Sequence, residues 1–163
     1  MNWTYKNTMV NHLFPSTKIN FDSAVYFQDS LKMIFYRGGR PWYYKYWLHS
    51  GNTLGCCGKT ILLDYNKLNC NGDSALISNI KQSKDSVVIH QFCKETIVKN
   101  DILGELKCIR TLQKNYRDGV VVLRINRYYS RNIGLVYNQQ EGFNASGMAT
   151  YTETKDLASF KTP

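Results

Sequence analysis

The sequence predicts an α+β fold in which one N-terminal helix packs on a small, mostly antiparallel three-stranded sheet. Apolar residues between positions 27 and 35 recur at helical spacing, so we expect residues 23–36 to form a helix with one apolar face. Residues 60–65 alternate apolar with other side chains, and residues 87–92 open on a β-branched run, and both patterns are typical of strands. The residues before Trp47 are the candidate for the third strand.

Capping signals set the bounds of the expected helix. Asp22 and Ser23 can each accept a hydrogen bond from a free backbone N–H at a helix start. Gly38-Gly39 allows the left-handed turn that ends a helix, and Pro41 prevents its resumption. Residues 1–21 are polar with scattered aromatics, so we interpret them as an irregular arm.

The second half of the chain carries an insertion and an extension. Residues 68–85 are rich in Asn, Ser and Gly, which favours a surface loop with room for a short helical turn at 75–80. In the extension 113–163, Asp118-Gly119 predicts a hairpin turn before a strand at 120–125, and a further short strand is expected at 133–137. From residue 139 onward we expect a tail that is extended along a partner or disordered. Residues 22–112, between the arm and the extension, are expected to form one folded domain.

Composition favours a polyanionic partner. The chain has 163 residues and a formal net charge of +9, so nucleic acid is the first candidate and an anionic membrane the second. We find no apolar run long enough to span a membrane and no signal peptide. The five cysteines are odd in number and lack a Cys-x-x-Cys spacing, which argues against a disulfide framework and favours a reducing compartment.

Basic and aromatic residues are interleaved in two stretches, a pattern typical of nucleic-acid binding. Residues 31–63 contain no acidic side chain, and residues 127–131 repeat the pattern. The RNA-binding candidates from these stretches are Arg37, Arg40, Lys45, Trp47, His49, Lys59, Arg127 and Arg131. Membrane-interface or protein–protein surfaces use the same side chains, so these readings stay open.

Three chemical alternatives fail on spacing. Gly58-Lys59-Thr60 lacks the earlier glycine of a phosphate-binding loop, because position 53 is threonine. The adjacent pair Cys56-Cys57 with His49 does not have the spacing of a zinc site. On a strand, His90 and Cys93 would face opposite sides, which argues against a nucleophile–base pair. We therefore predict no catalytic residues, no metal and no cofactor.

One stretch carries a family resemblance. The order Glu-Thr-Ile-Val at 95–98, Leu-Gly-Glu-Leu at 103–106 and Arg-Thr at 110–111 resembles the signature of the universal small-subunit ribosomal protein S nineteen family. Lys45-Tyr46-Trp47 and Gly58-Lys59-Thr60 are similar to two further family motifs, so the resemblance spans roughly residues 22–112.

The resemblance implies a structural constituent of the small ribosomal subunit, placed in its head and bound to ribosomal RNA. Its other implied partners are the neighbouring S thirteen protein and, at the subunit interface, tRNA or the large subunit. It adds Lys107, Arg110, Lys114 and Arg117 to the RNA-binding candidates, and Gly58, Gly104 and Glu105 as turn residues. Because Lys, Asn, Tyr and Ile are frequent, as in AT-rich organelle genomes, we expect a mitochondrial matrix ribosome, no membrane contact and no homo-oligomer.

A second hypothesis comes from a different class of protein. The basic-aromatic surfaces also suit an accessory subunit of a mitochondrial membrane protein complex, with contacts to protein or lipid. Co-sedimentation with RNA, lost on nuclease treatment, would distinguish the ribosomal protein from such a subunit. An enzyme is the third possibility.

Overall fold

The computed structural model describes residues 2–14, 16–27, 30–37, 40–50, 53–56, 60–131 and 133–161, with the backbone alone for 2–3, 56, 160–161 and the described parts of 18–50. These residues form one antiparallel sheet and a single 3-10 turn, η1 (Tyr65–Lys67). Among them, no helix is long and apolar enough to span a membrane. The strands are β1 (Asn2–Asn11), β2 (Ser16–Phe27), β3 (Ser30–Arg37), β4 (Arg40–Ser50), β5 (Thr53–Cys56), β6 (Thr60–Asp64), β7 (Ser74–Gln82), β8 (Asp85–Phe92), β9 (Thr96–Asn100), β10 (Gly104–Arg117), β11 (Val120–Ser130), β12 (Gly134–Phe143) and β13 (Ala149–Lys161).

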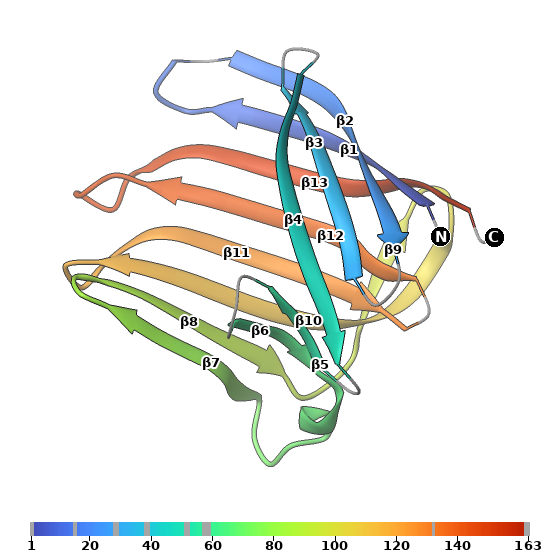
Figure 1. Cartoon of the computed structure of the whole chain (residues 1–163). Coiled ribbons are helices and arrows are strands. Elements are labelled where there is room, and N and C mark those ends of the chain that lie inside the picture. Colours follow the sequence, from blue (N-terminus) through green and yellow to red (C-terminus); the bar gives the residue numbers. More distant parts are fainter. Residues whose placement is uncertain are drawn as a thin grey trace.

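The sheet is a meander that is joined through its first and last strands. The strand order is β6-β5-β4-β3-β2-β1-β13-β12-β11-β10-β8-β7, and β9 pairs with β10 alone (Figure 1). Pairing of β1 with β13 runs from Asn2↔Lys161 to Asn11↔Tyr151. Most other strands pair with the next strand along the chain because short hairpins return the chain antiparallel. The exceptions are β6, which does not pair with β7, and β8, which pairs with β10 in place of β9.

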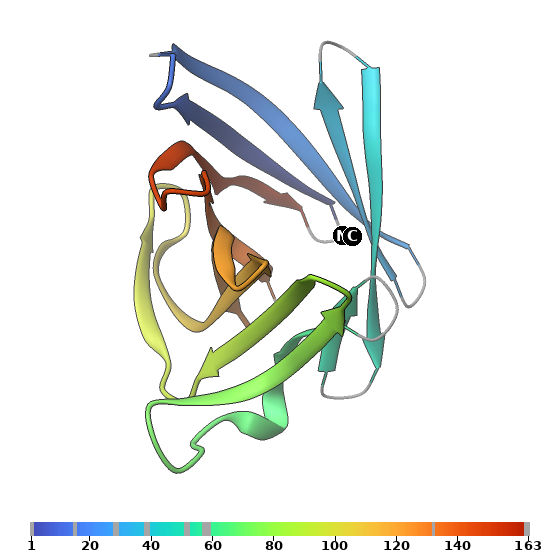
Figure 2. The ribbon, with the colours of Figure 1, turned by 90° about the vertical axis from the view of Figure 1, so that its left-hand side faces the viewer.

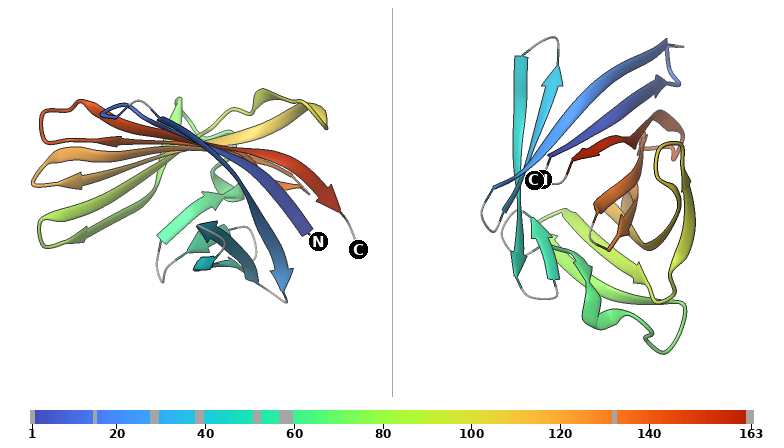
Figure 3. Two further views of the ribbon diagram at one scale, coloured as in Figure 1. Left: turned by 90° about the horizontal axis from the view of Figure 1, so that it is seen from above. Right: turned by 90° about the vertical axis from the view of Figure 1, so that its right-hand side faces the viewer.

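The sheet curls until its two edges approach each other, as the end-on views show (Figures 2 and 3). Side chains of β7 and β8 hold β6 in place. The backbone N–H of Asp64 donates to Gln91 Oε1 at 2.8 Å, and Gln91 Nε2 donates to the Asp64 carbonyl at 2.9 Å. The N–H of Ile61 donates to Ser78 Oγ at 3.3 Å. The curled sheet therefore closes around its own core.

The core combines an apolar cluster with a polar row. The apolar cluster consists of Tyr5, Leu62, Leu63, Ile89, Ile109, Tyr129, Leu135 and Leu157. Beside it, one row of side chains lies in register across six strands: Gln91, Thr111, Arg127, Asn138, Lys155 and Asn7. Arg127 Nη1 donates to Gln113 Oε1 at 2.9 Å, and Lys155 Nζ lies 3.5 Å from Glu153 Oε1. These contacts supply partners that buried charged groups require.

The prediction of an α+β fold was wrong. Residues 23–27 lie in β2 and residues 30–36 in β3, and the two strands pair with each other from Ser23↔Ile34 to Phe27↔Ser30. The helical spacing of Phe27, Leu31 and Ile34 was counted across two separate strands. Each segment is also rich in β-branched and aromatic residues, which favour strands, and so short an apolar run does not distinguish the two structures.

Other elements were also mispredicted. The expected irregular arm is β1 and the start of β2, and the expected loop at 68–85 contains β7 in place of a helical turn. The expected tail after residue 139 is the rest of β12 and the whole of β13. β1 and β13 pair with each other across most of the chain, which no local pattern can show. The segment that contains β7 was too polar to indicate a strand.

Four local predictions are confirmed. The strands expected at 60–65 and 87–92 are β6 and β8, and the residues before Trp47 lie in β4. The Asp118-Gly119 turn joins β10 to β11 with φ of 49° and 80°. Both residues are of the types that adopt positive φ in tight hairpins. Gly58 and residues 38–39 lie outside the described part of the chain.

Candidate functional site

A cleft of about 630 Å³ opens at one end of the curled sheet. It lies where β8 and β11 end and where β9 and β10 pair, and the segment after η1 completes its lining. These strand ends are at the opposite end of the sheet from the β7–β8, β10–β11 and β12–β13 turns (Figure 1). Its lining residues are Leu68, Asn69, Cys93, Lys94, Glu95, Lys107, Ser130 and Arg131. The cleft therefore depends on four segments that only the sheet pairing brings together.

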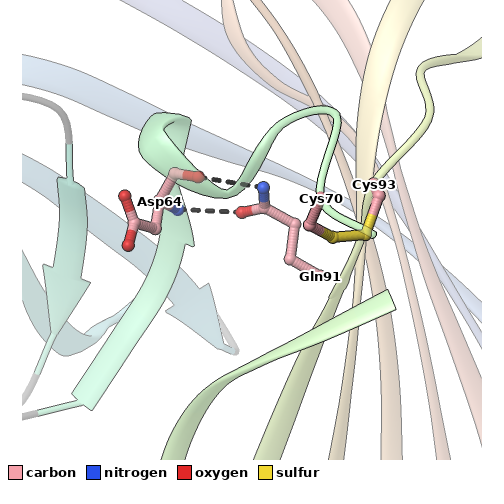
Figure 4. The surroundings of a disulfide bond; sticks show 4 residues. All are labelled: Asp64, Cys70, Gln91 and Cys93. Carbon is pink, nitrogen blue, oxygen red and sulfur yellow. Dashed lines mark hydrogen bonds between the residues drawn. A yellow bond between two sulfur atoms is a disulfide. The ribbon is translucent and has the colours of Figure 1, made fainter. Parts of the chain in front are cut away.

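A disulfide fixes one wall of this cleft. Cys70 and Cys93 are bonded, with their Cα atoms 5.3 Å apart (Figure 4). The N–H of Asn69 donates to the Cys93 carbonyl at 3.0 Å, and the N–H of Cys93 donates to the Asp73 carbonyl at 3.1 Å. The sequence argued against a disulfide framework and did not indicate this bond, because residue spacing does not show which cysteines the fold brings together.

Positive charge predominates in the cleft. Among the described residues, Lys94, Lys107 and Arg131 line it together with one carboxylate, Glu95. Arg131 Nε lies 4.0 Å from Glu95 Oε1, a long and exposed ion pair that contributes little stability. Within the described residues, Lys94 and Lys107 have no acidic partner, and both are exposed. The cleft can thus supply ammonium groups to an anion without first breaking strong ion pairs.

Aromatic packing orients Arg131. Its guanidinium carbon lies 5.6 Å from the centre of the Tyr65 ring, a cation–π distance. Burial raises the pKa of the Tyr65 hydroxyl, and the positive charge of Arg131 offsets part of that rise. Tyr65 therefore stays a neutral platform beside the cleft at physiological pH.

Cys108 lies buried close to the cleft, and its thiol is free. Burial, with a smaller contribution from the negative charge of Glu95, raises the pKa of its thiol to about 11. A thiol must lose its proton to act as a nucleophile, so Cys108 is inert near pH 7. Cys93 is bonded to Cys70, which excludes the reactive pair considered for His90 and Cys93.

The raised pKa of Cys108 predicts a pH-dependent stability. The folded protein holds this proton more tightly than the unfolded chain does, so the contribution is complete below the unfolded pKa of about 8.5. It is lost as pH rises through about 11. Urea unfolding between these limits should show that wild type loses more stability than Cys108→Ser. If the free energy of unfolding fell equally with pH in the two proteins, the raised pKa of Cys108 would be contradicted.

The predicted RNA-binding residues do not share one surface. Lys107 and Arg131 meet in the cleft, whereas Arg117 pairs with Asp85 at 3.2 Å at the turn end of the sheet. Arg127 is only 6% exposed and points into the core, and Lys114 is half-buried on β10. For Arg37, Arg40, Lys45, Trp47 and His49 the structure describes the backbone alone, on β3 and β4, and Lys59 lies outside the described residues.

Arg110 is engaged by its own neighbours. Its Nε and Nη2 donate to Asn126 Oδ1 at 3.1 and 2.8 Å. Its guanidinium carbon lies 4.4 Å from the centre of the Phe92 ring and 6.0 Å from that of Tyr128. Arg110, on β10, therefore links β8 and β11 through its contacts with Phe92 and Asn126.

The turn residues of the sequence signature lie at the β9–β10 hairpin. Gly104 begins β10 with φ of 74°, a conformation that favours glycine. Glu105 lies 3.8 Å from Lys99 across this hairpin, so its ion-pair partner is neither Lys107 nor Arg110. Sequence reasoning missed Lys94, Tyr65, Cys70 and Ser130, since none carries a local signal for the cleft.

The comparisons with known proteins give no relative. No family model, no curated protein and no solved structure matches this chain. Within the described residues, no group of three His, Cys, Asp or Glu side chains is arranged to hold a metal ion. The function is therefore inferred from the cleft and its lining residues.

Proposed function

We propose that this protein is a non-catalytic binding protein whose cleft takes a small anionic ligand bearing phosphate or carboxylate groups. The observation that carries the proposal is the convergence of Lys94, Lys107 and Arg131 on one cleft against the single carboxylate of Glu95. The volume of about 630 Å³ lies within the usual range of small-molecule sites. Lysine and arginine form the charge-assisted hydrogen bonds that such anions require.

The distribution of charge favours a small ligand over a long polyanion. RNA binding uses a continuous basic surface that neutralises many phosphates. Here Arg127 points into the core, and Arg117 lies at the opposite end from Lys107 and Arg131. Membership of a ribosomal subunit or of a membrane complex stays a prediction from sequence.

We also propose that the protein works in an oxidising compartment. The Cys70–Cys93 disulfide closes a 23-residue separation beside the cleft. Structural disulfides persist in secreted, periplasmic or similar compartments and are rare where glutathione keeps thiols reduced. This proposal replaces the matrix location expected from composition. Gel analysis with thiol alkylation, performed on protein from its native cells, would show free Cys70 and Cys93 if the proposal were wrong.

Pyrophosphate binding measured by calorimetry tests the proposed function. We expect Lys107→Ala and Arg131→Ala each to weaken binding about 10- to 100-fold, because each removes a charge-assisted bond of about 1.5–3 kcal/mol. Arg117→Ala removes the same charge at the far end and should change affinity less than about twofold, since exposed charges at that distance are screened.

The same titrations distinguish the alternatives. Equal losses in all three variants would mean that pyrophosphate responds to net charge alone, and no cleft would be involved. Tight, salt-sensitive binding of a single-stranded RNA that survives the Lys107→Ala and Arg131→Ala changes would favour the RNA-binding prediction instead. Citrate, titrated in parallel, separates a preference for phosphate from a preference for carboxylate.

A further inference from the structure

β9 is an edge strand of the sheet, as β6 and β7 are at the two ends of the strand order. β9 pairs with β10 from Gly104↔Asn100 to Cys108↔Thr96 and with no other strand of the described chain. Within the described residues, no backbone hydrogen bond links the opposite edge of β9 to another segment. Proteins usually protect such edges, because a row of unpaired N–H and C=O groups recruits another strand.

The exposed face of β9 is apolar at its centre and charged on either side. Ile97 and Lys99 alternate along β9, so their side chains lie on one face, and Glu95 directly precedes the strand at the same spacing. All three are exposed. Ile97 is 55% exposed. Glu95 and Lys99 have only long, solvent-exposed ion pairs, with Arg131 at 4.0 Å and Glu105 at 3.8 Å. Pairs of this kind cost little to exchange for others.

We propose that β9 pairs antiparallel with β9 of a second copy, about a twofold axis through Ile97. This register places Glu95 of each copy opposite Lys99 of the other, and Ile97 opposite Ile97. The strand is thus complementary to itself, as a twofold interface requires. Cross-strand ion pairs and apolar pairs of this kind are the usual stabilising units of a sheet.

Neighbouring registers are less favourable. An axis through Val98 would set Ile97 against Lys99 and Glu95 against Asp101, which puts two carboxylates together. An axis through Thr96 would set Glu95 against Ile97. The charges of this segment therefore select one register, in which the partner's Lys99 approaches the Glu95 that lines the cleft.

The proposed dimer reverses the sequence-based expectation that the chain forms no homo-oligomer. A five-residue seam buries less surface than most stable interfaces, so we expect a dissociation constant of roughly 10–500 µM. Sedimentation velocity of the full chain, from about 5 µM to about 1 mM, should show a concentration-dependent dimer.

Charge reversal tests the register directly. Glu95→Lys and Lys99→Glu each convert two attractive pairs per dimer into two repulsive pairs, so each should weaken dimerisation about tenfold or more. The double variant Glu95→Lys/Lys99→Glu restores opposite charges in the same register and should return the constant to within about threefold of wild type.

A matched control and the contrary results complete the experiment. Asp118→Lys makes the same charge change at the opposite end of the sheet and should leave dimerisation unchanged. A wild-type chain that stays monomeric at every concentration overturns the proposal. A dimer that resists both single reversals, or a double variant that stays monomeric, overturns it as well.

Discussion

Gln91→Leu is expected to lower the free energy of unfolding by about 2–5 kcal/mol, because it leaves two backbone groups of Asp64 without partners. Gln91 is fully buried and accepts from the Asp64 N–H while donating to the Asp64 carbonyl. Leucine fills a similar volume but makes neither bond. Since these bonds hold β6 against β8, the loss acts where the curled sheet closes (Figure 4). Urea denaturation followed by circular dichroism measures the change.

Ser78→Ala provides the matched control for Gln91. It removes the single, longer hydrogen bond from the Ile61 N–H at 3.3 Å in the same closure. We expect a cost of about 1 kcal/mol, typical of one neutral hydrogen bond. Equal and small losses in the two variants would show that the side-chain bonds do not hold β6, and that apolar packing of Leu62 and Leu63 closes the sheet alone.

The double variant Cys70→Ser/Cys93→Ser is expected to lose about 3 kcal/mol of stability. The disulfide links residues 23 apart, and a loop of this length restricts the unfolded chain by about that amount. For a chain of this size the midpoint of thermal unfolding should fall by roughly 6–12 °C. Thermal melts with and without dithiothreitol provide the measurement.

Dithiothreitol distinguishes the disulfide from the bulk of its side chains. Reduced wild type should melt at the temperature of the double variant, and the double variant should not respond to the reductant. If dithiothreitol did not change the melting temperature of the wild-type protein, Cys70 and Cys93 would not be bonded in solution. The oxidising compartment proposed above would then lose its support as well.

The strands that the sequence predicted correctly are those with strong local signals. Val87-Val88-Ile89 marks β8, and Asp118-Gly119 marks the β10–β11 turn, whatever the rest of the chain does. β2 and β3 were misassigned because an apolar pattern spread over two short strands imitates a helical period. Pairing of β1 with β13 and closure of the sheet by Gln91 have no local signature, so only the structure reveals them.

The candidate site was predictable only in part. Lys107 was expected to bind RNA from the family resemblance and Arg131 from the basic-aromatic pattern, and the structure places both in one cleft. Glu95 stood in the sequence signature without an assigned partner, and Lys94, directly before it, was missed. Their meeting with Arg131 depends on where β8 ends and where β11 ends, and strand register sets both. Residue types alone therefore indicated the chemistry of the ligand, and the sheet determined its location.

The pairing of β1 with β13 has a kinetic consequence. Contacts between segments more than a hundred residues apart raise the contact order of the chain, which slows folding. During synthesis β1 can pair with β2 at once, but its other edge stays unpaired until β13 has been made. Its exposed strand edge is then a hazard for misassembly, so we expect this protein to reach its native state late and with help from chaperones.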